Sequence, residues 1–201
     1  MHGLDAVRER RSVKYFDPDY AISDNEIKEL LSLSLLSPTA FNIQNWRFLV
    51  VDEPKLRQEL RAASGEQVQI TDCSLLVVIC ADLMAWQKSP QRYWRNAPED
   101  VQQIMVPMIS EFFEHDKQLQ RDEAMRSCGI AAQTLMLSAK TMGYDSCPMD
   151  GFDGARVAEL IQLPKDHCIS MFVAIGKALK PARERAGQLA YEEVVLRNRF
   201  A

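Results

Sequence analysis

The sequence has few of the motifs by which proteins commonly bind phosphate, nucleotides or metal ions. It contains neither the G-x-x-x-x-G-K-[ST] pattern of a P-loop nor the G-x-G-x-x-G fingerprint, and its only closely spaced glycines are Gly151 and Gly154. Its five cysteines include no C-x-x-C pair, and its three histidines are scattered. Neither a disulfide framework nor a zinc site is therefore indicated, and a bound phosphate group would have to be held by side chains.

Long apolar runs and an excess of positive charge are also missing. No uncharged apolar stretch reaches the roughly 20 residues that cross a bilayer, and the opening MHGLDAVRER is charged where a secretory signal needs an apolar run. The formal net charge of -4 argues against the broad basic surface that non-specific nucleic-acid binding requires. We therefore expect a cytoplasmic protein with reduced thiols that binds no membrane, no nucleic acid and no metal.

The composition is that of an ordinary globular protein, with 47% hydrophobic and 26% charged residues. No repeat and no glycine-rich or proline-rich linker divides the chain, so we expect one domain over residues 1–201. A capping box at Ser23 and Glu26 predicts the start of a helix, and Pro54 predicts another. Apolar patterning further predicts helices over 3–10, 99–119 and 123–142, and strands over 47–52, 74–82 and 168–176. This order predicts an α+β sandwich in which long helices flank one mixed, mostly antiparallel sheet.

Three further segments bear on how the chain is covered. The helical segment 127–139 carries no charge, which predicts that it is buried on nearly every side. The core of a single domain could bury it, and so could a second subunit that packs against it. The tail over 177–201 begins polar and ends apolar, which argues against a free tail. Residues 83–97 suggest a lid or an insertion. Its large aromatic residues are Trp86, Tyr93 and Trp94, and they could either line a cavity or pack only within the lid.

Four polar stretches need a common explanation: RRSVK (10–14), SPTAFNIQNW (37–46), CPMDGFD (147–153) and KPARERAGQ (180–188). The first and last are basic clusters at opposite ends of an acidic chain. Together they could bind a compact dianion such as a phosphate monoester. Arginine forms bidentate hydrogen bonds with phosphate, and serine and lysine supply further donors. The first stretch is expected to be extended, with Ser12, Lys14 and Phe16 on one face because side chains alternate along a strand.

Together, and in this order, the four stretches resemble the FMN-dependent nitroreductase family. The resemblance runs from about residue 4 to the C-terminus and is weakest over 83–120, where family members vary. It implies a nitroreductase-like α/β sandwich that forms an intertwined homodimer, with the segment 177–201 as a C-terminal arm. It also implies one FMN bound at each subunit interface and NAD(P)H as a transient co-substrate.

The family patterns are matched residue by residue. The Arg-x-Ser-x-Lys pattern implies that Arg10 and Ser12 hold the FMN phosphate and ribityl chain, with Lys14 near the pyrimidine edge of the flavin. A basic pair near the end of the family chain completes the phosphate site, for which Arg183 and Arg185 are the candidates. The loop pattern, which in the family reaches the partner's flavin, is matched by Pro38, Thr39, Asn42, Gln44 and Trp46, with Asn45 where proline is usual. The turn whose backbone N–H groups face flavin N5 in the family is matched by Pro148, Asp150, Gly151 and Phe152.

The resemblance thus implies a full set of cofactor-binding residues: Arg10, Arg11, Ser12, Lys14, Pro38, Thr39, Ala40, Asn42, Gln69, Pro148, Met149, Asp150, Gly151, Arg183 and Arg185. Within this set Lys14, Asp150 and Gly151 are the catalytic candidates, with Asp150 acting through its backbone. Gln67 is the alternative to Gln69, and ordinary surface charge is the alternative for Arg11. The implied substrate cavity is lined by Phe41, Phe112 and Phe113, although helix packing explains the last two equally well.

The implied activity is that of an NAD(P)H-dependent FMN oxidoreductase. Hydride passes from NAD(P)H to flavin N5, and a nitroaromatic, quinone or similar electron-poor molecule then takes its place, in a ping-pong mechanism. The cofactor carries the chemistry and the protein orients it. The alternatives are a specialised branch of the family, such as flavin fragmentation or reductive dehalogenation, and a flavin-binding or redox-sensing protein without turnover.

Overall fold

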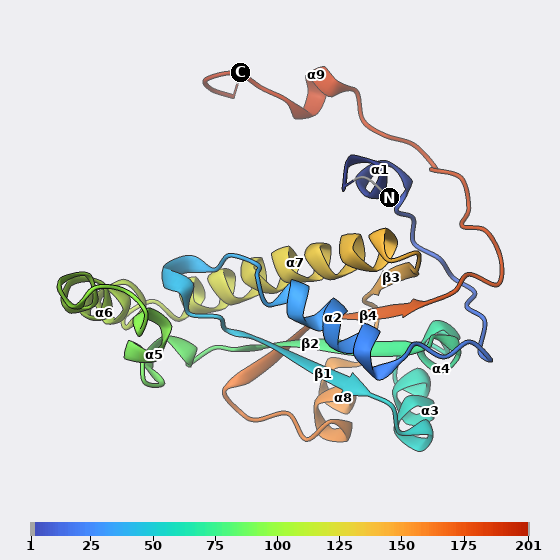
Figure 1. Ribbon diagram of the computed structural model, residues 1–201, viewed down its shortest axis with the longest axis horizontal. Coiled ribbons are helices and arrows are strands. Elements are labelled where there is room, and N and C mark those ends of the chain that lie inside the picture. The colour runs from blue at the N-terminus through green and yellow to red at the C-terminus, as the bar shows by residue number, and fades with distance from the viewer. Residues whose placement is uncertain (1–2, 201) are drawn as a thin grey trace.

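A four-stranded antiparallel sheet forms the centre of the part of the chain that the computed structural model describes, residues 3–200 (Figure 1). The strands are β1 (Trp46–Val51), β2 (Leu75–Asp82), β3 (Asp145–Met149) and β4 (His167–Gly176), in the spatial order β1-β2-β4-β3. The predicted strands 47–52, 74–82 and 168–176 are confirmed to within a residue or two. β3 was not predicted, because Pro148 and its polar neighbours suggest a turn; proline is tolerated here because β3 is an edge strand.

Helices cover both faces of the sheet, as the α+β prediction requires. On one face lie α2 (Asp24–Ser34) and α7 (Lys117–Thr141), and on the other α3 (Pro54–Ala62), α4 (Gln69–Asp72) and α8 (Gly154–Leu160) (Figure 1). The remaining helices are α1 (Gly3–Glu9), α5 (Gln91–Trp94), α6 (Glu99–Phe113), α9 (Tyr191–Val194) and the short 3-10 helices η1 (Ala40–Asn42) and η2 (Ala85–Gln87).

β2 is the most deeply buried strand, with all eight of its residues buried. Side chains alternate along it, so Val77 packs with the α2 and α7 side chains and Val78 packs with those of α3, α4 and α8. The capping box predicted at Ser23 and Glu26 is present at the start of α2. Pro54 begins α3 as predicted, and Gly143, with φ of +84°, follows the end of α7.

The boundary between the two long helices differs from the prediction. α6 ends at Phe113 and α7 begins at Lys117, whereas the predicted break lay between 119 and 123. Asp116 sets the start of α7, because its carboxylate accepts a hydrogen bond from the Leu119 N–H and caps the helix. The uncharged part of α7 is buried along most of its length, but Ile130 remains 39% exposed. One stripe of the helix is thus uncovered within a single chain.

The segment after α1 is extended but does not form a regular strand. It makes one parallel bridge, Ser12 to Ser146, and one antiparallel bridge, Phe16 to Ala178. Val13 and Phe16 are buried while Lys14 is exposed. The prediction that Phe16 shares a face with Ser12 and Lys14 is therefore wrong, because the change of partner between the two bridges breaks the alternation.

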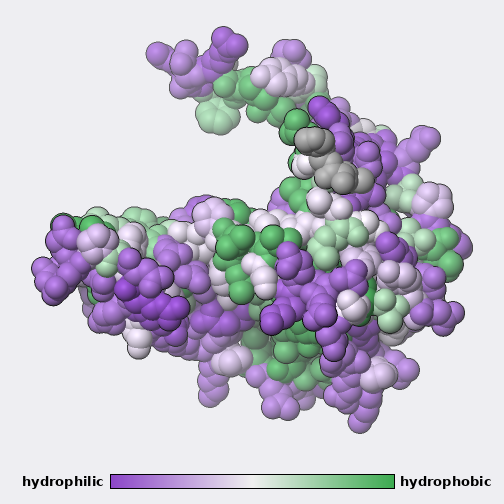
Figure 2. Space-filling view, in the orientation of Figure 1, coloured by the Kyte–Doolittle hydropathy of each residue, from purple (hydrophilic) through white to green (hydrophobic). Residues whose placement is uncertain are grey.

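The tail after β4 runs past α1 and stands away from the rest of the molecule as an arm (Figure 1). In Figure 2 this arm overhangs open space and carries several hydrophobic residues. Leu189, Tyr191 and Val194 are 59–68% exposed, and Phe200 is 88% exposed. The arm is not covered by the rest of its own chain. The prediction that this apolar segment is buried therefore requires a second copy of the chain.

Among residues 3–200, no helix is both long enough and apolar enough to span a membrane.

Candidate functional site

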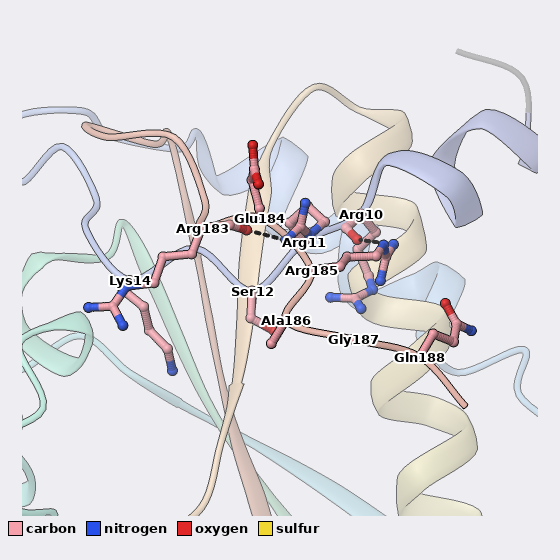
Figure 3. Close-up of a pocket in the computed structure, with 10 residues that line it drawn as sticks. All are labelled: Arg10, Arg11, Ser12, Lys14, Arg183, Glu184, Arg185, Ala186, Gly187 and Gln188. Carbon is pink, nitrogen blue, oxygen red and sulfur yellow. Dashed lines mark hydrogen bonds between the residues drawn. The ribbon is translucent and has the colours of Figure 1, made fainter. Parts of the chain in front are cut away.

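The two basic clusters meet in one pocket of about 510 Å³ (Figure 3). The segment between α1 and α2 brings Arg10, Arg11, Ser12 and Lys14 to this pocket, and the tail brings residues 183–188. Backbone hydrogen bonds between Asp17 and Lys177 and between Leu179 and Tyr15, each 2.9 Å long, hold the two segments together. The predicted convergence of residues about 170 positions apart is therefore found in the fold.

Charge in this pocket is strongly positive. Its lining has five basic side chains and one carboxylate, that of Glu184. Arg11 donates to the backbone oxygen of Arg183, and Arg185 donates to the backbone oxygens of Arg8 and Arg10 at 3.2 and 3.4 Å. These bonds tie Arg11 and Arg185 to the opposite segment. Arg10 Nη1, in contrast, is buried and has no hydrogen-bond partner among the residues described.

A second cavity, of about 380 Å³, adjoins the first, since Lys14 and Arg183 line both. Its wall is completed by Tyr15, Glu66, Gln67, Val68 and Gln69. Gln69 is only 5% exposed, while Gln67 Nε2 donates to the backbone oxygen of Asp150 at 2.9 Å. Both glutamines that the sequence offered thus reach the cavity, and Gln67 also contacts the 150–151 turn, a role that its position alone did not indicate.

The turn after β3 lies beside this cavity. Gly151 has φ of +78°, a conformation that other residues adopt only with strain, and its N–H donates to Asp150 Oδ1 at 2.9 Å. Pro148 and Met149 belong to β3 itself. Lys14 Nζ lies 3.4 Å from Cys147 Sγ, in the same strand. Lys14 and Gln67 therefore line one cavity, and the hydrogen bond of Gln67 joins that cavity to the 150–151 turn.

The loop over residues 38–45 lies elsewhere. It follows α2 at the end of the sheet near α5 and α6, far from the basic pocket of the same chain (Figure 1). Thr39 Oγ1 accepts from the Gln44 N–H at 3.0 Å, and Asn42 Nδ2 donates to the Tyr93 backbone oxygen at 2.8 Å. One chain does not bring Pro38, Thr39, Ala40 or Asn42 to the pocket, so only a second copy could do so.

The three candidate cavity phenylalanines form one aromatic group beside this loop. Phe41 lies 5.2 Å from Phe112 and 6.1 Å from Phe113 between ring centroids. Phe113 is 1% exposed and packs in a small core with Trp86 and Tyr93, which agrees with the helix-packing alternative. Phe112 is 45% exposed, so it remains the accessible member of the group. Trp46 is a core residue, 5% exposed.

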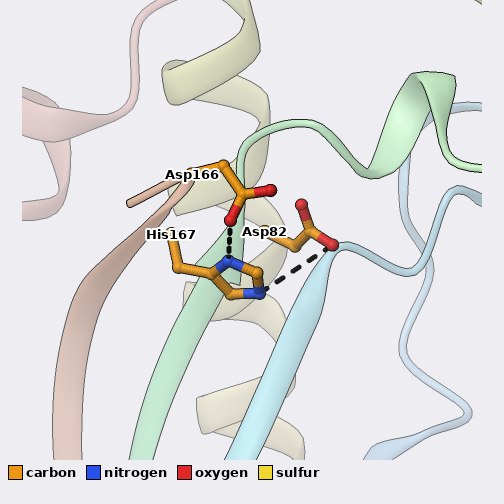
Figure 4. Close-up of side chains that lie close together, drawn as sticks. All are labelled: Asp82, Asp166 and His167. Carbon is orange, nitrogen blue, oxygen red and sulfur yellow. Dashed lines mark hydrogen bonds and ion pairs between the residues drawn. The ribbon is translucent and has the colours of Figure 1, made fainter. Parts of the chain in front are cut away.

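A group of side chains that the sequence did not indicate lies at the end of β2 and the start of β4 (Figure 4). His167 Nδ1 is 2.7 Å from Asp166 Oδ1, and its Nε2 is 3.8 Å from Asp82 Oδ2. By position the three could hold a metal ion. However, Lys88 Nζ already contacts both carboxylates, at 2.8 and 2.6 Å, and Arg47 pairs with Asp82 at 2.9 Å. The group is therefore an ion-pair network that joins two strands to the 83–97 segment.

Comparison with known proteins places this geometry in a family. A family model described as the nitroreductase family matches residues 7–177. The chain belongs to the nitroreductase family. Protein DrgA of Synechocystis sp. is 53% identical to it over 182 residues, which is 90% of this chain and 87% of that protein. A candidate NAD(P)H nitroreductase of Bacillus subtilis, YodC, is 32% identical over 186 residues, or 90% and 92% of the two chains.

Solved structures agree with the nitroreductase fold. A candidate nitroreductase of Exiguobacterium sibiricum, crystallised in complex with FMN, superposes with a TM-score of 0.90 at 27% identity and covers 97% of this chain and 96% of its own. The predicted nitroreductase-like α+β fold and the family are thus confirmed, and with them membership of a family of oxidoreductase enzymes.

The residues of this family member fit FMN. The phosphate of FMN is a dianion, and the basic pocket offers clustered guanidinium groups with one buried nitrogen, Arg10 Nη1, that has no protein acceptor among residues 3–200. The adjoining cavity offers room beside Lys14, Gln67 and the Gly151 turn. Ala186 and Gly187 also line the basic pocket. They were not among the predicted site residues, and the only signal in the sequence was their position inside the second basic cluster.

Proposed function

We propose that this chain is an FMN-dependent oxidoreductase that takes reducing equivalents from NAD(P)H and delivers them to nitroaromatics, quinones or similar electron-poor small molecules. The observation that carries the proposal is the pocket in which the two basic clusters meet, which shares Lys14 and Arg183 with the adjoining cavity. The FMN complex of a structural neighbour at 27% identity supports the choice of cofactor.

The basic pocket binds the phosphate in this proposal. Arg10 contributes its guanidinium group to the lining, with one buried nitrogen that has no hydrogen-bond partner among residues 3–200, and Ser12 adds a hydroxyl. Arg183 and Arg185 close the pocket from the tail. The backbone oxygen of Arg183 accepts from the Arg11 side chain, and the Arg185 side chain donates to the backbone oxygens of Arg8 and Arg10, so these bonds link the two walls. Charge-assisted hydrogen bonds of this kind are roughly twice as strong as neutral ones.

The cavity next to it holds the ring. When bound, FMN supplies the atom that accepts a hydride and passes it on. Lys14 places its Nζ 3.4 Å from Cys147 Sγ, and a positive charge at this position favours additional negative charge on the ring. Gln67 fixes the 150–151 turn through the Asp150 oxygen, and the lack of a side chain at Gly151 lets the backbone approach closely.

A second subunit completes the site in this proposal. The loop over 38–45 and the Phe41–Phe112 group lie far from their own chain's pocket, while the arm and one stripe of α7 are uncovered. We propose a homodimer in which this loop and these phenylalanines reach the partner's flavin, so that Phe112 borders the space for the substrate.

The test begins with the purified protein, which we expect to be yellow with about one FMN per chain. Chromatography of the ligand released by heat identifies it, and FAD, or no flavin after reconstitution, would refute the proposal. Anaerobic addition of NADH or NADPH should bleach the flavin, and a nitroaromatic or quinone should restore the colour. A bound FMN that neither nucleotide bleaches would instead indicate a flavin-binding protein without turnover.

A further inference from the structure

A second basic pocket, of about 410 Å³, lies at the loop end of the molecule, apart from the pocket between the basic clusters. It is lined by Gln44, Trp46, Arg47, Arg92, Tyr93 and Arg95. Every charged residue in this lining is an arginine. Such a wall repels cations and is suited to an anion, which guanidinium groups bind bidentately when it is a phosphate or a carboxylate.

The three arginines are not equally available. Arg47 is held in place, because its Nη1 donates to the backbone oxygens of Gln44 and Trp46 at 2.9 and 2.8 Å and its Nη2 pairs with Asp82. Arg92 lies over the Tyr93 ring, 4.8 Å from its centroid. Neither Arg92 nor Arg95 has a carboxylate within 4.0 Å in the part of the chain that is described.

A buried donor in the same lining also has no acceptor. Trp46 is 5% exposed, and its Nε1 finds no hydrogen-bond partner among residues 3–200. A buried N–H without an acceptor costs free energy. Two guanidinium groups without a carboxylate partner among residues 3–200 therefore line this pocket. Arg92 Nη2 donates to the neutral Tyr93 hydroxyl at 2.7 Å, which leaves the positive charge of the group uncompensated.

The arginine-bearing helix is joined to the loop that is proposed to reach the partner's flavin. Asn42 Nδ2 donates to the Tyr93 backbone oxygen at 2.8 Å, and Trp94 Nε1 donates to the Phe41 oxygen at 3.0 Å. Phe41, Asn42 and Gln44 all have positive φ, between 44° and 55°, and strain of this kind persists only where surrounding contacts hold it. Arg92 and Arg95 are thereby kept at a set place relative to the loop.

We propose that Arg92 and Arg95, with Arg47 behind them, bind a phosphate group of the pyridine dinucleotide that reduces the partner subunit's flavin. The inference rests on the proposed function, in which the loop beside this pocket borders the flavin of a second copy. A dinucleotide whose nicotinamide reaches that flavin carries its phosphates away from the ring, and Arg92 and Arg95 line a pocket beside the loop, together with Gln44. The shared chemistry is a phosphate, either the pyrophosphate common to NADH and NADPH or the 2′-phosphate of NADPH.

The experiment uses the FMN-loaded full chain and stopped-flow reduction of the flavin by NADPH and by NADH. Arg95→Gln removes one charge, Arg92→Gln/Arg95→Gln removes two, and Arg95→Lys keeps the charge but loses the planar fork. The matched control is Lys55→Gln/Arg156→Gln, which removes two positive charges from exposed positions on α3 and α8. FMN content and the rate of flavin reduction by dithionite are measured for each variant, to show that folding and the flavin itself are intact.

The double variant is expected to weaken the apparent affinity for the dinucleotide at least tenfold while the limiting rate stays near that of the wild type, since loss of one charged hydrogen-bond partner typically has an effect of this size. Arg95→Lys should fall between the wild type and Arg95→Gln. A loss confined to NADPH identifies the 2′-phosphate, and 2′,5′-ADP should then inhibit the wild type competitively. An equal loss for NADH and NADPH identifies the pyrophosphate.

Two results would overturn the inference while leaving the proposed function intact. In the first, wild type and double variant show the same affinity as the control for both nucleotides. In the second, the double variant binds the dinucleotide as tightly as the wild type but reduces its flavin at a lower limiting rate. The arginines would then only hold the loop in position. If the wild-type flavin is reduced by neither nucleotide, the proposed function fails and the inference fails with it.

Discussion

Lys14 and Arg10 belong to one short stretch of the sequence but occupy different places in the site. Arg10 lines the basic pocket but not the adjoining cavity, and its Nη1 is buried without a partner among the described residues. Lys14 also lines the adjoining cavity, where its Nζ lies beside Cys147 Sγ. The two side chains should therefore affect a bound flavin differently, one through its phosphate and the other through its ring.

Arg10→Ala should weaken FMN in its oxidised and reduced states alike, because the phosphate contact is the same in both. Loss of a charged hydrogen-bond partner costs about 1.5–3 kcal/mol, or roughly a tenfold to hundredfold change in affinity. Fluorescence titration of the apoprotein with FMN measures the change. Unaltered affinity would mean that Arg10 is an ordinary surface charge.

Lys14→Ala should weaken reduced FMN more than oxidised FMN and lower the flavin's reduction potential, because negative charge appears on the ring only on reduction. For a two-electron couple, about 30 mV corresponds to about 1.4 kcal/mol, so a shift of tens of millivolts is expected in a spectroscopic redox titration. Arg10→Ala serves as the control, with weakened binding and little change in potential. Equal weakening of both redox states by Lys14→Ala would contradict its placement at the ring.

At the scale of elements, the ends of β2 and β4 are joined by the Asp82, Lys88, Asp166 and His167 network. The hydrogen bond from Lys88, followed by that from His167, lowers the pKa of Asp166 to about 2. Asp82 is almost wholly buried, while the Asp166 side chain is 37% exposed. Lys88 thus links the 83–97 segment to both strands, and its contact with Asp166 is strongest at pH values at which the Asp166 carboxylate is ionised.

The free energy of unfolding should depend on Asp166 in a particular pH window. Its folded pKa lies below the ordinary unfolded value of about 3.9, so its contribution is fully present above about pH 5 and is lost as the pH falls toward 2. Given its partial exposure, Asp166→Asn should cost about 0.5–1 kcal/mol at pH 7. Urea unfolding of both proteins between pH 7 and pH 3 should show the difference narrowing, and a difference that widens on acidification would refute this assignment.

The capping box of α2 gives a second test at the same scale. Ser23 Oγ accepts from the Glu26 N–H at 3.3 Å, and the Glu26 carboxylate accepts from the Ser23 N–H at 3.2 Å. Ser23→Ala should lower the free energy of unfolding by about 1 kcal/mol, as measured by urea denaturation. Ser32→Ala, at an exposed interior position of the same helix, should leave it almost unchanged; equal effects of the two substitutions would show that the cap contributes little.

At the scale of the whole molecule, the arm and the helix α7 leave apolar surface uncovered. Leu189, Tyr191 and Val194 lie on an arm that stands off the body of the chain, and Ile130 lies on the uncovered stripe of α7. Extended apolar surface of this kind marks an interaction site. The proposed homodimer would cover both and bring the 38–45 loop to the basic pocket of the other chain.

The full chain should therefore sediment as a species of twice 22.9 kDa, and deletion of residues 189–201 should weaken the dimer. The deletion leaves every residue that lines the basic pocket in place, since the last is Gln188. Folding, association and FMN binding should nevertheless weaken together, because they are linked. Sedimentation velocity with absorbance at the flavin band measures both, and a full-length monomer that binds FMN tightly would exclude the arrangement.

Local patterns in the sequence determined most of the elements and the composition of the basic pocket. The apolar run of β2, the capping box at Ser23 and the proline at the start of α3 depend on neighbours a few residues away, so they could be predicted. The break between α6 and α7 could not, because Asp116 is one polar residue among many and only its hydrogen bond to the Leu119 N–H distinguishes it.

Contacts between distant segments decided the rest. Nothing local distinguishes Gln67 from Gln69, or marks Asp82 and His167 as neighbours; these depend on how the turn after β3 and the antiparallel pairing of β2 with β4 place them. The same holds for Phe113, which is buried, and Phe112, which is exposed, although they are adjacent in sequence. The sequence thus determined which chemical groups are available, and packing in three dimensions decided which of them meet, because burial and hydrogen bonding between remote residues depend on the whole fold.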